Sequence, residues 1–269
     1  MAAGDWLFSI LQVLLILVGA AWKAREGFPI MDFLGSSDHA LPSVWKDKPW
    51  FALHLILYIG QMIGLCSILL REMVPNGNIP SKIGYGIQTF VASAYLSRIL
   101  GLSTALPLLS LWTLHRCRRT NQSMQTIARR SRSEEEVFLS RVFWFSTLTH
   151  IGPLLVAVMA TFAAGPESPY HLSNSFLGVP DCSQLPCSQV AQKDARLRQI
   201  NEVTGTSGGF FLTLGLFCQV LGAKGTRLGW RRLTRVFFVS LIAGPAAGGA
   251  DVLLLRDSFV RVSRREKKA

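Results

Sequence analysis

The chain has 269 residues, of which 49% are hydrophobic and only 16% are charged, and its formal net charge is +12. A soluble domain has about 25% charged residues, so this composition argues against a soluble fold and favours a membrane protein. Lysine and arginine lie in short runs between apolar blocks and form no basic stripe interleaved with aromatic residues, so nucleic acid is not an expected partner.

Apolar residues gather into blocks, and a helix that spans a bilayer needs about 20 mostly apolar residues. In chain order the blocks are residues 6–22, 50–70, 83–114, 137–164, 208–222 and 236–255. The third block contains Arg98 and Pro107, and is one kinked helix or a broken pair. The fifth is short unless it begins near Thr204. We expect an all-α, polytopic transmembrane bundle of about six to seven spans, with residues 1–269 in a single transmembrane domain.

The longest polar segment, residues 165–202, separates the fourth block from the fifth. Its content of proline, serine and asparagine predicts irregular structure. Cys182 and Cys187 lie within it. Outside the cytosol they can form a small disulfide loop, although two free thiols are an equal alternative.

The basic runs between blocks predict the orientation of the chain. Runs at residues 116–132 and 224–235 are separated by two blocks, so both can face the cytosol. The basic tail, residues 261–269, follows one block later and would face the other side if that block crosses. Either the tail is an exception to the charge rule, or the last block turns back at Gly244 and Pro245 as a re-entrant hairpin.

Small residues recur four positions apart, which allows helix backbones to approach closely in lipid. The pairs are Gly60 with Gly64, Gly205 with Gly209, and Gly244 with Gly248. We expect them to pack helices within one chain, with a dimerisation face as the alternative.

Ionisable side chains inside apolar blocks are candidates for function, because each costs several kcal/mol in hydrocarbon. They are His54, Arg98, His150 and Asp251, and Glu72 follows the end of the second block. Burial favours a protonated carboxyl, so Asp251 is predicted to donate a proton, unless it pairs with a basic neighbour at the membrane edge.

The other candidates have structural alternatives. Arg98 binds an anionic group or ties carbonyl groups together. His54 and His150 handle protons or bridge helices as neutral imidazoles. Tyr95 and Trp144 line a pocket that stabilises a cation through their π faces, or they belong to an interfacial aromatic belt.

Common cofactor motifs are absent from the sequence. It contains no P-loop, no G-x-G-x-x-G and no H-E-x-x-H. It also lacks the paired aspartate clusters that hold magnesium on a diphosphate. We therefore expect no cofactor and no metal.

Two segments resemble the small fungal membrane-bound terpene cyclases of the ascofuranone-pathway type, which include meroterpenoid and indole-diterpene cyclases. Residues 237–256 read FFVSLIAGPAAGGADVLLLR, and residues 70–77 read LREMVPNG. The resemblance implies a cofactor-independent enzyme of the endoplasmic reticulum that protonates an epoxide or alkene of a prenylated precursor and cyclises it. It implies Asp251 and Glu72 as catalytic acids, although in those relatives one acid follows a tryptophan and here Glu72 follows Arg71. The other candidates would then contact the substrate: Arg98, His150, Tyr95, Trp144 and His54.

Two other functions fit the same composition. One is a transporter or channel for a small solute, although no paired halves of an inverted repeat are visible. The other is a non-catalytic membrane scaffold. Membrane lipids and a hydrophobic isoprenoid are the expected partners, and the sequence leaves the oligomeric state open.

The charge difference between the loops predicts that residues 116–136 face the cytosol and residues 165–202 face the lumen. A glycosylation sequon engineered near Ser173 should therefore acquire glycan in the reticulum, whereas the existing sequon at Asn121 should stay bare. Mobility shifts after glycosidase treatment measure both. Glycan on Asn121 would contradict this topology.

Overall fold

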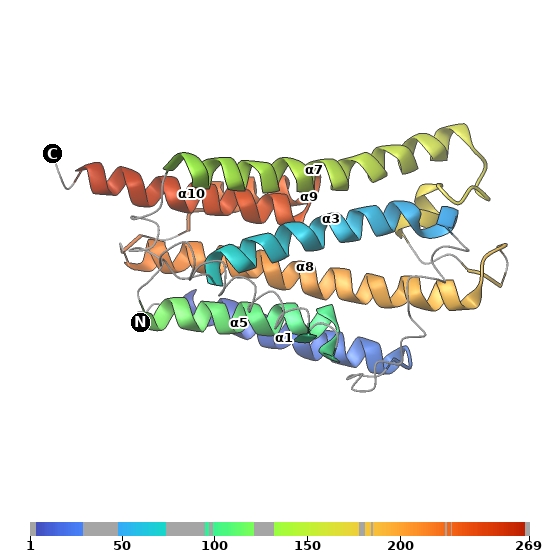
Figure 1. The fold of residues 1–269 in the computed structure, drawn as a ribbon, viewed down its shortest axis with the longest axis horizontal. Helices are drawn as coiled ribbons and strands as arrows, with labels where there is room; N and C mark the ends of the chain where they lie inside the picture. The colour runs from blue at the N-terminus through green and yellow to red at the C-terminus, as the bar shows by residue number, and fades with distance from the viewer. Residues whose placement is uncertain are drawn as a thin grey trace.

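The computed structural model describes residues 4–28, 48–73, 95–96, 99–120, 132–177, 181–183, 185–223, 225–226 and 228–266. Within these residues the structure is helical and contains no strand, which confirms the predicted all-α class. The helices are α1 (Gly4–Arg25), α3 (Lys48–Met73), α5 (Leu102–Thr120), α7 (Arg132–Ala163), the short η2 (Ser173–Leu177), α8 (Gln189–Ala223), α9 (Trp230–Ala243) and α10 (Pro245–Glu266). They run roughly along one common axis (Figure 1).

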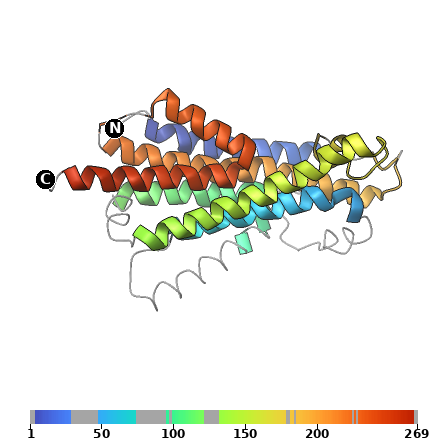
Figure 2. The same cartoon turned by 90° about the horizontal axis from the view of Figure 1, so that it is seen from above.

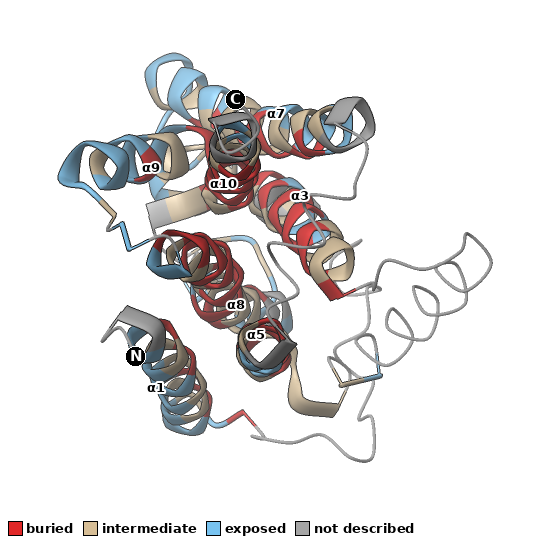
Figure 3. Cartoon of the chain, turned by 90° about the vertical axis from the view of Figure 1, so that its left-hand side faces the viewer, coloured by how far each residue is buried: buried red, intermediate tan, exposed pale blue. Residues whose placement is uncertain are grey.

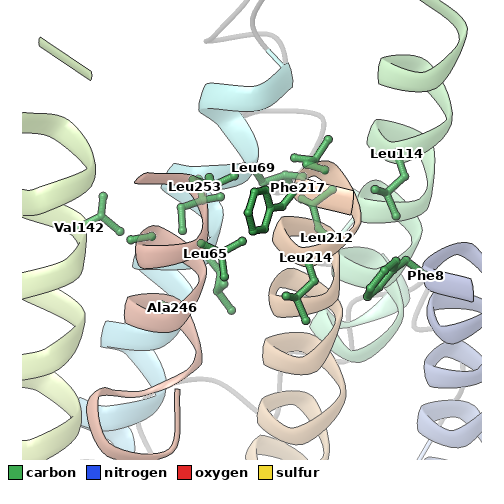
Figure 4. Packing of buried hydrophobic residues seen from close by; sticks show 14 of the residues in the cluster. Phe8, Leu65, Leu69, Leu114, Val142, Leu212, Leu214, Phe217, Ala246 and Leu253 are labelled. Carbon is green, nitrogen blue, oxygen red and sulfur yellow. The ribbon is translucent and has the colours of Figure 1, made fainter. Parts of the chain in front are cut away.

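Helix α8 lies at the centre of the bundle and contacts α1, α3, α5 and α10. Viewed along the axis, α1 and α5 lie on one side of α8, and α3, α7 and α10 lie on the other, with α9 outermost (Figure 3). Apolar side chains from these helices meet in one core, which includes Leu65 of α3, Phe217 of α8 and Leu253 of α10 (Figure 4).

The outer helices expose apolar side chains, as expected of a surface that faces lipid. Leu148, Met159 and Phe162 of α7 are 69%, 68% and 88% exposed. Four helical segments are long and apolar enough to cross a membrane: Trp6–Arg25, Ala52–Met73, Glu136–Ala163 and Ala195–Ala223. These match the first, second, fourth and fifth predicted blocks, and indicate a membrane protein. The predicted total of six to seven spans is not confirmed.

The third block is interrupted at Gly101, whose φ of 71° ends one helical segment before α5 begins. Lys23 of α1 donates a hydrogen bond to the Leu100 carbonyl at 3.0 Å. Asn201 of α8 accepts the Ser103 backbone N–H at 3.0 Å, and so caps the first turn of α5. Polar side chains from two other helices thus satisfy the backbone at the break. Residues 83–94 and Arg98 lie outside the described residues.

The sixth block is a hairpin of two helices, because Gly244, with φ 95°, separates α9 from α10. Gln61 of α3 is fully buried and accepts the Ala246 N–H at 2.9 Å at the start of α10. Its Nε2 donates to the Ser146 carbonyl of α7 at 2.9 Å. The side-chain amide of Gln61 thus satisfies a backbone N–H at the start of α10 that has no partner within its own helix.

The hairpin decides between the two explanations of the basic tail. Helix α10 returns toward the end of the bundle where α9 begins, so the C-terminal end of α10 lies at the same end of the bundle as the C-terminal ends of α5 and α8 (Figures 1 and 2). Arg261 of α10 contacts Glu136, near the start of α7, at 2.9 Å. The basic runs therefore share one end, and the charge rule needs no exception.

The predicted irregular segment, residues 165–202, is partly wrong, because α8 already begins at Gln189. Residues 189–202 contain neither proline nor glycine, and Ala195 and Ile200 are buried against the bundle. Proline and serine are concentrated before residue 189, and their content led to a prediction of irregular structure for the entire segment. Cys182 and Cys187 form a disulfide.

The glycine pairs lie at close helix contacts, as predicted for packing within one chain. A Cβ atom on Gly60 would lie 2.1 Å from Thr149 Oγ1 of α7, and one on Gly209 would lie 2.8 Å from Leu65 Cδ2 of α3. A Cβ atom on Gly248 of α10 would lie 1.9 Å from Ser240 Oγ and 3.0 Å from Ser240 Cα of α9.

We expect Gly248→Leu to lower both the yield and the thermal stability of folded protein, because α9 and α10 would have to separate. Overpacking of this kind costs about 1–3 kcal/mol or more. Gly152→Ala of α7 is the control, since a Cβ atom there meets nothing within 4 Å. Size-exclusion profiles and melting curves in detergent measure the effect. An unchanged melting temperature for Gly248→Leu would refute close packing of the hairpin.

Candidate functional site

Four charged side chains form a buried ion network between the C-terminal turn of α3 and the middle of α10. They are Arg71 and Glu72 of α3, and Arg256 and Asp257 of α10, and their side chains are between 0% and 7% exposed. Arg256 binds Glu72 through two parallel hydrogen bonds of 2.8 and 2.9 Å, and its Nε binds Asp257 at 2.9 Å. Arg71 bridges the same two carboxylates at 2.6 and 2.7 Å.

The four side chains of the ion network carry two positive and two negative charges. Each carboxylate receives hydrogen bonds from both guanidinium groups. Removing one partner of such a buried set leaves an uncompensated charge, which costs about 3–5 kcal/mol. Glu72 therefore joins α3 to α10. A carboxylate that accepts guanidinium hydrogen bonds carries no proton to donate while those contacts last.

Asp251 lies about one and a half turns before Arg256 on α10 and forms a separate ion pair. Arg235 of α9 donates to its two carboxylate oxygens at 2.7 and 3.2 Å. The Asp251 side chain is 11% exposed and that of Arg235 is 55% exposed. This geometry favours the structural alternative for Asp251, although nothing in the structure tests its role as an acid.

A second polar cluster lies toward the opposite end of the bundle, where α3, α7 and α8 meet. His54 Nε2 of α3 lies 2.5 Å from Glu202 Oε2 of α8. Glu202 is also close enough to Tyr58 and His150 to interact with both electrostatically. We call His54, Tyr58, His150 and Glu202 the histidine cluster. It brings together two predicted site residues, His54 and His150, around a carboxylate that the sequence analysis did not select.

The two aromatic candidates lie outside both clusters. Tyr95 is 66% exposed, and Trp144 of α7 is 60% exposed with its ring edge-on to Phe143. Both positions fit the interfacial belt better than a buried cation pocket. Among the described residues, no group of three or more His, Cys, Asp or Glu side chains is placed to hold a metal ion.

An apolar groove of about 390 Å³ lies between α1, α5 and α8. Trp6, Leu108, Leu111 and Trp112 line it, with Arg118 stacked on the Trp6 ring at 4.6 Å. None of the predicted acids contributes to its lining. The groove is therefore separate from both charged clusters.

Sequence comparison places the chain among fungal biosynthetic proteins. It is 51% identical over 274 residues to "Indole-diterpene biosynthesis cluster protein S" of Claviceps paspali, with 97% of each chain covered. The chain belongs to this family of cluster proteins S. It is also 47% identical over 285 residues to "Lolitrem B biosynthesis cluster protein S" of Epichloe festucae, covering 97% of this chain and 98% of the relative. No protein-family model and no solved structure matches the chain.

Membership in the cluster protein S family supports a role in fungal secondary metabolism, which is the coarser part of the predicted resemblance. The finer part, a relation to cyclases of the ascofuranone-pathway type, stays a prediction. The names of the relatives state a biosynthetic context and no activity.

The sequence analysis gave no role to three charged residues of these two clusters. Glu202 lies at the end of the segment predicted to be irregular. Arg256 and Asp257 lie just past the last apolar block and before the basic tail. A usable signal was present, because Arg71-Glu72 and Arg256-Asp257 are matching basic-acidic pairs, each at the end of an apolar block.

We expect Arg256→Gln and Glu72→Gln each to destabilise the fold by about 3–5 kcal/mol, because each leaves a buried charge unbalanced. The double variant should lose less than the sum, since Arg71 and Asp257 remain as a pair. Melting curves of purified protein give the comparison. Arg261→Gln is the control, because its partner Glu136 is 45% exposed and such pairs contribute little. Strictly additive losses would argue against a coupled ion network.

Proposed function

We propose that this protein is a membrane-bound terpene cyclase that acts on a prenylated precursor in indole-diterpene biosynthesis, in the membrane of the endoplasmic reticulum. The observation that carries the proposal is the likeness over 97% of the chain to a protein named for an indole-diterpene biosynthesis cluster. The resemblance of residues 237–256 and 70–77 to membrane-bound cyclases supplies the type of reaction.

The architecture suits a lipophilic substrate. Membrane-length helices with apolar outer faces give an isoprenoid access from the bilayer without passage through water. The core between α3, α8 and α10 is packed with apolar side chains, and exclusion of water protects a carbocation from premature capture.

The proposed reaction is an isomerisation. An acid protonates the epoxide oxygen, the carbon–oxygen bond breaks, and internal alkenes attack the resulting cation to close rings. Loss of a proton from the last cation restores the formula of the substrate. The chain supplies the proton, the shape of the site and the return base, and the reaction consumes no cofactor.

The source of the proton is constrained by the ion pairs. Glu72 is bound by two buried guanidinium groups, so we propose that it positions α3 against α10. Asp251 is paired with the half-exposed Arg235, so it can act as an acid only after that contact opens. Another group with a transferable proton is otherwise required.

The test is incubation of membranes that contain the protein with an indole carrying an epoxidised geranylgeranyl chain. We expect a cyclic product of unchanged mass, which chromatography and mass spectrometry would separate from the precursor. Membranes from the same host without the protein are the control. Unchanged precursor in the presence of folded protein would contradict the cyclase and leave transport or a scaffold.

A further inference from the structure

The histidine cluster differs from the other interhelical carboxylate pairs in the nature of its cation. Glu72, Asp257, Asp251 and Glu136 each bind an arginine, and a guanidinium keeps its protons in proteins. Glu202 instead binds an imidazole, which can lose and regain a proton near neutral pH. The pair of His54 and Glu202 therefore joins a carboxylate to a group that readily transfers a proton.

The geometry of the pair orients the imidazole. Nε2 of His54 lies 2.5 Å from Oε2 of Glu202. Because a carboxylate can only accept a hydrogen bond, Nε2 is the donor of this contact, and Nδ1 is the ring nitrogen left to face another group. The side chains of His54 and Glu202 are 14% and 20% exposed, so the pair is sheltered without being sealed. The Phe176 ring of η2 lies edge-on to His54 at a centroid distance of 6.3 Å.

A second observation comes from α7. His150 Nδ1 is buried and forms no hydrogen bond of ordinary geometry among the described residues, and the imidazole ring also lies near the Leu241 carbonyl of α9. Leaving a buried polar atom without a partner costs about 1–3 kcal/mol of stability. Such an atom is expected where a bound ligand supplies the missing hydrogen bond. Outside the cluster, Arg198 of α8 and Cys66 of α3 also interact electrostatically with Tyr58.

We propose that the histidine cluster is the proton-donating site of this protein, with His54 as the donor, Glu202 as its orienting carboxylate and His150 as a contact for the substrate oxygen. This deepens the proposed cyclase function and rests on it. The Nδ1–H of His54 is transferred to the epoxide oxygen, and the electron pair of the breaking carbon–oxygen bond stays on oxygen as a hydroxyl. The neutral imidazole then takes the proton lost from the last cation, so protons balance over one turnover.

The experiment measures turnover per folded molecule for His54→Gln, Glu202→Gln and Asp251→Asn side by side. His54→Gln should lose on the order of a hundredfold or more, as expected when a general acid is removed. Glu202→Gln should lose activity as well, and it carries the test where variants of His54 do not fold. His115→Gln on α5 is the matched control, because that histidine is exposed and lies outside the cluster.

A purely structural role is separated by chemical rescue. Added imidazole should restore turnover to His54→Ala without changing its melting temperature, because a free imidazole replaces the proton donor and not the packing. Retained turnover in His54→Gln, or a collapse in Asp251→Asn alone, would overturn the assignment while leaving the cyclase intact. Absence of any cyclic product from the wild-type protein would instead refute the proposed function itself.

Discussion

Charges buried between helices must be neutralised locally, and the bidentate contact between Arg256 and Glu72 does this at the junction of α3 and α10. Because Arg256 is fully buried, an unpaired carboxylate or guanidinium at this point would cost several kcal/mol. The contact therefore fixes the axial position of α10 relative to α3. The position of the Gly244 turn and the contact of Arg261 with Glu136 are consistent with that register.

The last apolar block does not cross the bundle as one helix, and this is how the basic runs of the chain come to lie at one end. Residues 236–255 have the composition of a span, yet Gly244 and the buried Gln61 divide them into two antiparallel helices. An amide from α3 can stabilise this turn only because Gly244 has no side chain, since a Cβ atom there would lie 2.7 Å from the Gln61 amide. The absence of a side chain at Gly244 therefore allows both the close approach of α3 and the hydrogen bond to its Gln61 amide.

Local signals predicted much of the fold and little of the site. Block length identified four membrane-length helices, and the spacing of Gly60 and Gly248 predicted close helix contacts that the structure contains. The residues of the two clusters are far apart in sequence, as Glu202 is from His54 by 148 positions. Hydropathy cannot reveal such pairing, because it depends on which helix faces rotate toward each other. Glu202 was missed for a simpler reason, since polar residues before it disguised a helix as a loop.

The ion network and the histidine cluster lie toward opposite ends of the bundle, and we propose that the first serves stability and the second proton transfer. Arginine neutralises a carboxylate over the whole physiological pH range, which suits a fixed joint such as the ion network. Histidine neutralises it reversibly, which suits a site where a proton must leave and return. A chain that only needed to hold α3 against α8 would gain more from an arginine or an apolar pair than from His54 and Glu202. The proposed proton transfer would account for an imidazole at this position, and for a second histidine, His150, that interacts electrostatically with the same carboxylate.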